Sequence, residues 1–281
     1  MTGHDSVGLF SSCLPGWDAQ RVVDVARALR FTSVEWGAGP GQALEPGQDG
    51  ASARERCAAA GLSVSGLSVQ DPEVSAGTPR RAQPYVRLAS ALGARFVRLF
   101  APQYGGGSLA RDERSARAGL AAVIDFAAAA GVAVLIETSP GTLAPSAERA
   151  VGLVEHQAPE HAGVLFDPGN TVIEGYLAPA LAVARLGPYL QHVHVKNIAW
   201  RRATGRWVWR YAAMSSGMVP WPELLDVLAR AGYRGGFSID HLTGRPTPAR
   251  LEVESEHLRA LVAAHREPDS RKELDPSPAS V

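Results

Sequence analysis

Residues 191–197 have the sequence Gln-His-Val-His-Val-Lys-Asn. Side chains alternate between the two faces of a β-strand, so His192, His194 and Lys196 share one face and two valines occupy the other. Three ionisable side chains on so short a strand do not form an apolar core. The valines therefore cover the core, and the polar face meets either solvent or a functional pocket.

Three other apolar runs in the chain also end in an acid. They are residues 134–137, 164–167 and 237–240, which end at Glu137, Asp167 and Asp240. Three acids and a histidine, each near the end of an apolar run, indicate one common site. This pattern favours a pocket over solvent for the polar face of residues 191–197.

Apolar runs and helical periods alternate along the whole chain. We predict strands at residues 7–12, 31–36, 62–69, 94–101, 132–138, 163–167, 190–197 and 236–242. Helices are predicted at residues 18–29, 51–60, 83–92, 114–130, 147–157, 179–186, 220–231 and 248–265. Eight strand–helix units in about 265 residues match the roughly 250 residues that are usual for a (β/α)8 barrel.

The competing α/β architecture is a doubly wound sheet. It requires a glycine-rich nucleotide turn after a strand, and Ser-Pro-Gly-Thr-Leu at residues 139–143 does not match that turn. We therefore expect a single-domain (β/α)8 TIM barrel over residues 1–265. Residues 266–281 are charged and rich in proline and serine, and they are predicted to form a flexible tail.

Composition excludes several classes of protein. The 281 residues are 46% hydrophobic and 20% charged, as in a globular domain with one large core, and the net charge of zero provides no basic field for nucleic acid. Two cysteines form no disulfide framework, the first residues lack a signal-peptide pattern, and the longest apolar run is broken by Asp125 and Gly131. We expect a cytoplasmic protein that binds neither nucleic acid nor membrane.

In (β/α)8 barrels the active site lies at the C-terminal ends of the strands, where Glu137, Asp167, His194 and Asp240 are predicted to meet. Three carboxylates and an imidazole form a hard, oxygen-rich site. Such a site favours one divalent metal ion, Mn²⁺ or Mg²⁺ first, with Co²⁺ and Zn²⁺ as alternatives. The alternative role of each acid is to cap the helix that follows it or to pair with an arginine.

Further polar and aromatic residues are candidates for substrate contact. His192 either faces the pocket or packs low in the barrel, and Arg98 either binds a phosphate or carboxylate or forms an internal ion pair. Trp17 follows the first strand and could stack on a sugar face. Glu35, which ends the second strand, is expected to line the pocket without binding metal. Trp36 has the parity of the helix side, where core packing is expected.

Residues 198–219 combine four arginines with three tryptophans. This segment, which includes Arg201, could close over the pocket and grip an anionic or aromatic substrate. The alternative is a surface hairpin that serves in contacts between copies of a homo-oligomer.

Four segments resemble those of the xylose isomerase-like barrels, the superfamily of sugar isomerases and epimerases, inosose dehydratases and endonuclease IV. They are Leu-Ile-Glu-Thr at residues 135–138, Phe-Asp-Pro-Gly-Asn at 166–170, His-Val-His-Val-Lys-Asn at 192–197, and Gly-Tyr-Arg-Gly-Gly-Phe-Ser-Ile-Asp at 232–240. The resemblance implies a metal bound by Glu137, Asp167, His194 and the acid that ends the eighth strand. The neutral charge and the eight histidines do not favour the three-metal endonuclease IV.

Two positions depart from the epimerase pattern. The last metal-binding acid of the epimerases is a glutamate, whereas this chain has Asp240, which is one methylene shorter. The epimerases also carry a substrate-contacting histidine three residues after the strand-six aspartate, and here that position is Asn170, which the resemblance makes a candidate substrate contact. Both departures weaken the transfer of any one epimerase mechanism.

The resemblance assigns Glu137 and Asp240 as the proton-transferring pair, and Lys196 is a candidate to stabilise developing charge. We expect a metal-dependent isomerase or epimerase that acts on a sugar or polyol ketone through a metal-held enediolate. One alternative is a lyase on the same scaffold, either inosose-dehydratase-like or cleaving C-glycosides. A second alternative is a non-catalytic binding or assembly subunit.

Overall fold

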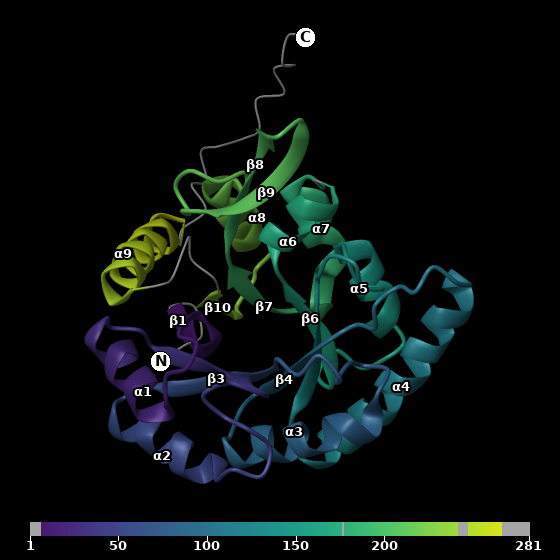
Figure 1. Ribbon diagram of the computed structural model, residues 1–281, viewed down its shortest axis with the longest axis horizontal. Helices are drawn as coiled ribbons and strands as arrows, with labels where there is room; N and C mark the ends of the chain where they lie inside the picture. The colour runs from purple at the N-terminus through teal and green to yellow at the C-terminus, as the bar shows by residue number, and fades with distance from the viewer. Residues whose placement is uncertain (1–6, 176, 241–246, 266–281) are drawn as a thin grey trace.

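The computed structural model describes residues 7–175, 177–240 and 247–265. Eight parallel strands close into a barrel in the order β1-β10-β7-β6-β5-β4-β3-β2, which confirms the predicted (β/α)8 TIM barrel (Figure 1). The strands are β1 (Val7–Phe10), β2 (Ser33–Ala38), β3 (Ser63–Val69), β4 (Phe96–Phe100), β5 (Ala133–Glu137), β6 (Ala162–Phe166), β7 (Leu190–Val195) and β10 (Gly236–Ile239).

Helices surround the barrel on its outer face (Figure 1). They are α1 (Ala19–Ala28), α2 (Gly50–Ala59), α3 (Pro79–Ala91), α4 (Leu109–Ala129), α5 (Ala147–Val154), α6 (Pro168–Glu174), α7 (Pro179–Leu186), α8 (Trp221–Arg230) and α9 (Pro248–Ala264). Two short 3-10 turns are also present, η2 (Ser11–Cys13) and η3 (Gly187–Tyr189). The predicted tail at residues 266–281 lies outside the described residues.

Local sequence signals determine several helix boundaries. The Asp18 carboxylate accepts a hydrogen bond from the backbone N–H of Arg21 at 2.9 Å, so it caps α1. Gly61, Gly93 and Gly131 follow α2, α3 and α4 with φ of 74°, 65° and 72°, a left-handed conformation that glycine adopts without a Cβ penalty. The predicted boundaries of α1 to α4 lie within five residues of the observed ones.

Two helices begin earlier than predicted, and one was not predicted. The first turns of α3 and α4 are largely exposed, so no apolar period marks their start at Pro79 and Leu109. The short helix α6 begins with Pro168-Gly-Asn, directly after the predicted sixth strand, where no helix is predicted. Pro168 suits the first position of a helix because its N–H is not needed there, and the Asp167 side chain accepts from the Asn170 N–H at 3.0 Å.

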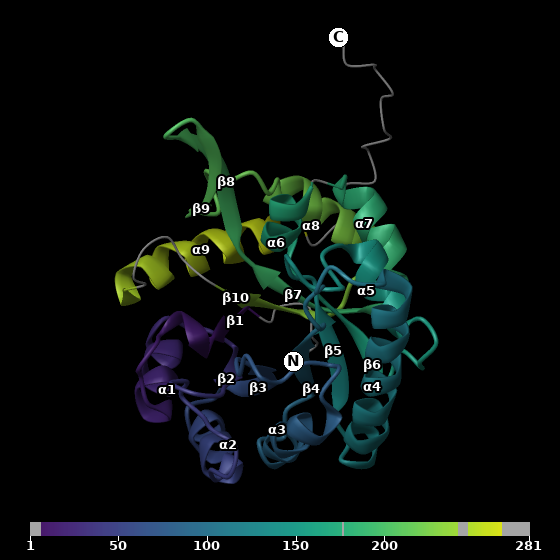
Figure 2. The same cartoon turned by 45° about the vertical axis from the view of Figure 1, so that its right-hand side comes forward.

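A two-stranded antiparallel hairpin of β8 (Asn197–Ala203) and β9 (Arg206–Ala212) follows β7 almost directly. It projects from the barrel beside α6 and α8 (Figure 2). Thr204 and Gly205 form its turn with φ of 48° and 78°, as a tight hairpin requires. Of the two alternatives for residues 198–219, the structure shows the hairpin, whereas its use in oligomer contacts stays a prediction.

The hairpin is anchored to the barrel at its base. The Trp200 indole N–H donates to the Val172 carbonyl in α6 at 3.3 Å, and the Tyr211 ring centroid lies 6.0 Å from Lys196 Nζ. Towards the tip, Trp207 is 68% exposed.

None of the helices in the described ranges combines the length and the apolar composition that a membrane span needs.

Candidate metal centre

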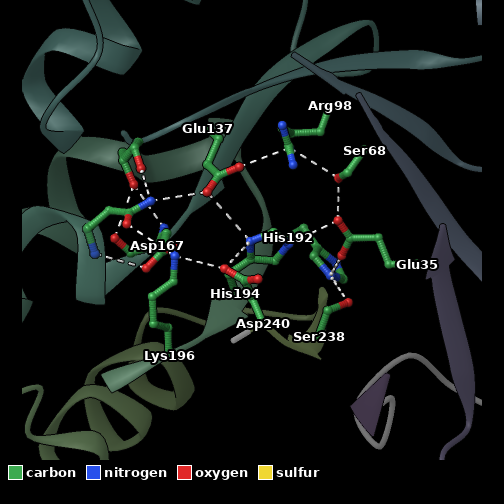
Figure 3. Close-up of polar contacts among 12 residues, drawn as sticks. Glu35, Ser68, Arg98, Glu137, Asp167, His192, His194, Lys196, Ser238 and Asp240 are labelled. Carbon is green, nitrogen blue, oxygen red and sulfur yellow. Dashed lines mark hydrogen bonds and ion pairs between the residues drawn. The ribbon is translucent and has the colours of Figure 1, made fainter. Parts of the chain in front are cut away.

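The four predicted metal ligands come together at the C-terminal ends of neighbouring strands (Figure 3). Glu137 is the last residue of β5, Asp167 follows β6, His194 lies in β7 and Asp240 follows β10. One potential ligand atom of each residue lies within 4.8 Å of those of the other three, and all four residues are buried. The adjacency of β5, β6, β7 and β10 in the barrel brings together residues that are far apart in the sequence.

The two ring nitrogens of His194 have different surroundings. Nε2 lies 2.9 Å from a carboxylate oxygen of Glu35, within hydrogen-bond range. Nδ1 lies 3.6 Å from Glu137 Oε1 and 3.6 Å from Asp240 Oδ2, beyond that range, and it has no hydrogen-bond partner among the described residues. A buried nitrogen between carboxylate oxygens suits a divalent ion, so the residues present fit the predicted metal.

Lys196 neutralises part of the negative charge of the centre. Its Nζ lies 2.7 Å from Asp167 Oδ2 and 2.8 Å from Asp240 Oδ2, and it donates to Asn170 Oδ1 at 3.1 Å. Burial lowers the pKa of Lys196, but the carboxylates of Asp167, Asp240 and Glu137 outweigh burial and raise that pKa well above its usual value. Lys196 is therefore a fixed positive charge inside the site.

The pKa values of Glu137 and Asp167 are shifted in opposite directions. Burial raises the pKa of Glu137, but the positive charge of Arg98, followed by His194 and Lys196, outweighs burial and leaves this pKa below its usual value. Burial raises the pKa of Asp167 to about 6; Lys196 opposes this shift, whereas Glu137 and Asp240 add to it. Glu137 is thus ionised at neutral pH, and Asp167 is the acid that takes up a proton first.

Metal binding is expected to weaken as the pH falls. Burial lowers the pKa of His194, but the carboxylates of Glu35 and Glu137 raise it well above its usual value, so at neutral pH an entering ion displaces about one proton from this imidazole. Below a pH of about 6, Asp167 is protonated as well, and about two protons are displaced. Titration of Mg²⁺ by calorimetry should give a binding constant that falls about tenfold per pH unit near neutrality and more steeply below pH 6. A binding constant that does not change with pH would contradict this assignment.

Two of the acids also have the alternative roles predicted for them, one as a helix cap and one as the ion-pair partner of an arginine. Asp167 caps α6 through Oδ1, and Glu137 Oε2 pairs with Arg98 Nε at 2.9 Å. In each case the other oxygen faces the cluster: Asp167 Oδ2 meets Lys196, and Glu137 Oε1 lies nearest His194. The cap and the ion pair thus orient the carboxylates towards the predicted metal position.

Arg98 and Asn170, both predicted substrate contacts, line the cavity but are engaged within the protein. Arg98 is 1% exposed and donates to the Val69 carbonyl at 2.8 Å and to Ser68 Oγ at 3.1 Å. The Asn170 amide N–H groups donate to Glu137 Oε1 at 3.1 Å and to the Thr138 carbonyl at 3.0 Å. For Arg98 the structure therefore favours the internal ion pair over a phosphate site.

The cavity above the cluster has a volume of about 340 Å³. Its lining is mainly polar and comes from the C-terminal ends of the strands: Phe10, Ser12, Gln42, Gln70, Arg98, Phe100, Glu137, Ser139, Asn170, Lys196 and Asp240. Neutral amides and hydroxyls beside two aromatic rings are suited to a compound that carries several hydroxyl groups.

The structure places three predicted substrate contacts away from this lining. His192 is buried lower in the barrel, with Nε2 2.7 Å from Ser238 Oγ, and it borders a separate cavity of about 230 Å³. Trp17 is half-buried beneath the guanidinium of Arg21, which lies 4.3 Å from the ring centroid. Arg201 is exposed on β8. For His192 the structure favours the buried structural role.

Glu35 is fully buried and makes side-chain contacts that the sequence does not indicate. It is 0% exposed, its carboxylate contacts His194 and His192, and the Ser68 hydroxyl donates to it. The alternation of side chains predicts that Glu35 points into the barrel, but not that it meets a histidine 159 positions away. Trp36, its neighbour, is fully buried in the core as predicted.

Residues 23–261 match the family model described as the Xylose isomerase-like TIM barrel. The chain belongs to this family. The match spans the barrel from α1 to α9 and contains all four residues of the metal cluster. A comparison with curated protein sequences gave no match.

Three solved structures illustrate the similarity of fold. An L-ribulose 3-epimerase is 18% identical with a TM-score of 0.73, covering 92% of this chain and 94% of its own. A xylose isomerase-like TIM barrel protein from Mycobacterium smegmatis in complex with magnesium is 16% identical with a TM-score of 0.73, and the match covers 95% of this chain and 100% of that protein. A probable 3-DHS dehydratase from Bacillus anthracis is 18% identical with a TM-score of 0.71, covering 90% and 98%. At these identities the likeness is one of fold.

Proposed function

We propose that this protein is a metal-dependent isomerase or epimerase of a sugar or polyol ketone. The observation that carries the proposal is the buried set of Glu137, Asp167, His194 and Asp240, of which Glu137 and Asp240 line a polar cavity. The likeness to an L-ribulose 3-epimerase and to a magnesium-bound family member supports both the reaction class and the metal.

Glu137 has the properties of the general base. When bound, a divalent ion would polarise the carbonyl of a hydroxy-ketone and acidify the adjacent C–H. Glu137 is ionised at neutral pH, and its carboxylate is held by Arg98 and by the amide of Asn170. A fixed carboxylate at the cavity floor can remove that proton without a prior rearrangement.

Asp240 and Lys196 complete the proton transfer. Asp240 follows β10, which is three strands along the barrel from β5, with β6 and β7 between them, so Asp240 can return the proton from a different side of the substrate. Return to the opposite face of the same carbon gives epimerisation, and return to the neighbouring carbon gives aldose–ketose isomerisation. The Lys196 ammonium lies beside Asp240 and stabilises negative charge that develops on the substrate oxygens.

A lyase is the second candidate, and the position of Lys196 is the observation that favours it. An ammonium group between Asp167 and Asp240 can donate a hydrogen bond to a departing β-hydroxide and stabilise its negative charge, so the same proton abstraction would end in dehydration. The likeness to a probable 3-DHS dehydratase adds support. Mass spectrometry of the product separates the two reactions, because a dehydratase product is lighter by one water and an epimer is not.

Metal analysis together with hydrogen exchange tests the proposal. The purified protein is expected to bind about one equivalent of Mn²⁺ or Mg²⁺ and to catalyse metal-dependent exchange of a ketose C–H in D₂O. A panel of ketoses and inososes identifies the substrate that exchanges fastest. Tight metal binding without exchange into any of them would favour the non-catalytic binding subunit, and the lack of any metal binding would exclude both enzyme classes.

Asp240→Glu is expected to keep or strengthen metal binding. The added methylene restores the side-chain length that the epimerase pattern has at this position, and Asp240 is only 9% exposed, so the longer chain reaches inward over the cluster. Calorimetric titration with Mn²⁺ should give a dissociation constant equal to or below that of the wild type. A lower melting temperature with unchanged metal affinity would instead identify Asp240 as a structural acid.

A further inference from the structure

Glu35 is a buried carboxylate that lies outside the metal cluster and outside the lining of the cavity. It belongs to β2, which lies across the barrel from β7. A buried carboxylate is costly unless hydrogen bonds and opposite charges compensate it. The contacts of Glu35 supply that compensation, and they lead to two of the four predicted metal ligands (Figure 3).

The first contact leads directly to His194. Glu35 Oε1 lies 2.9 Å from His194 Nε2. The carboxylate is a hydrogen-bond acceptor, so Nε2 is the ring nitrogen that donates to it. With a proton held on Nε2, the ring presents Nδ1, the atom that faces Glu137 and Asp240, to a metal ion, and the proton that the ion displaces is the one on Nδ1.

The second contact leads to Glu137 through two side chains. The Ser68 hydroxyl donates to Glu35 Oε1 and accepts from Arg98 Nε at 3.1 Å. Arg98 Nε in turn lies 2.9 Å from Glu137 Oε2. Ser68 is 0% exposed and Arg98 is 1% exposed, so neither side chain is free to take another orientation in solvent.

We propose that Glu35 is a positioning residue that orients His194 directly, and Glu137 through Ser68 and Arg98, towards a bound divalent ion. This inference rests on the proposed metal site. It predicts a role in metal affinity for a residue that touches neither the metal position nor the substrate cavity. Partners of this kind fix the ring orientation and the tautomer of a metal-binding histidine.

The experiment compares Mn²⁺ affinity by calorimetric titration in the wild type and in three variants. Glu35→Gln should weaken binding about 10- to 100-fold, and Ser68→Ala, which cuts only the path to Glu137, should weaken it less, by several-fold. Glu254→Gln is the matched control, because Glu254 is also a buried carboxylate, 5% exposed, but it lies on α9 and accepts from the Met214 backbone N–H at 3.1 Å. Its affinity should equal that of the wild type.

A spectroscopic measurement separates positioning from general loss of structure. In the ¹⁵N spectrum of the Mg²⁺-loaded wild type, His194 should show a protonated Nε2, and this signal should shift or broaden in Glu35→Gln but not in Glu254→Gln. Ser68→Ala keeps the charge of Glu35 and carries the test should Glu35→Gln fail to fold. Equal affinities and an unchanged His194 signal would overturn the positioning role alone. A wild type that binds no metal would overturn the metal site as well.

Discussion

Replacing Glu137 with glutamine is expected to abolish turnover and to leave the barrel folded. The amide has nearly the shape of the carboxylate but cannot accept a proton from carbon. General bases contribute roughly 10²- to 10⁴-fold to rate, so kcat should fall by about that factor. Arg98 loses its ion-pair partner but keeps its bonds to Ser68 and to the Val69 carbonyl, which limits the loss of stability. The rate of solvent deuterium incorporation into the best ketose measures the effect.

Glu148→Gln is the matched control for this variant. Glu148 lies on the outer helix α5, where its side chain is 66% exposed and pairs with Arg185. The same change of carboxylate to amide at this position should leave the exchange rate unchanged, since surface pairs contribute little. Circular dichroism should show that both variants are folded. If Glu137→Gln retained more than about a tenth of the wild-type rate, Glu137 would not be the base.

The sequence predicts the barrel well because each of its units carries a local signal. Apolar runs of strand length alternate with helical periods, and glycines such as Gly61, Gly93 and Gly131 mark helix ends. The helix starts at Pro79 and Leu109 are less predictable because their first turns face solvent and carry no apolar pattern. The short helix α6 depends on one side chain, Asp167, which is at once its cap and a predicted metal ligand.

The candidate ligands were predictable because the barrel fixes where strand ends meet. Glu137 ends a strand, Asp167 and Asp240 follow strands, and His194 lies next to the last residue of β7, so the topology brings them together. Substrate contacts were less predictable. The residue type does not reveal that Arg98 is engaged by Glu137, nor that His192 lies below the centre and not beside the cavity.

Contacts across the barrel were the least predictable feature. Glu35 and His194 are 159 positions apart and lie on strands that are not neighbours, so neither spacing nor strand pairing relates them. Their contact depends on side-chain length and on the closure of the barrel. The same closure joins Glu35 to Ser68 and Arg98, and it converts isolated polar residues into one network.

His194→Ala is expected to remove the bound metal. The wild type should contain about one equivalent of a divalent ion, and the variant should contain almost none after dialysis, because the substitution deletes the one nitrogen ligand and leaves three carboxylates near one another. The variant should also lose stability, by about 3–5 kcal/mol, since Glu35 keeps a buried charge without its nearest ion-pair partner. Elemental analysis and thermal unfolding measure the two effects.

His192→Ala separates these two effects. His192 lies on the same strand two residues earlier, is also buried, and also contacts Glu35, with Nε2 3.3 Å from Oε2. Its removal should lower the melting temperature in a similar way, yet the metal should be retained because His192 is not part of the cluster. Loss of metal in both variants would show that metal content follows stability and not ligation. Retention of metal in His194→Ala would exclude Nδ1 as a ligand and with it the proposed centre.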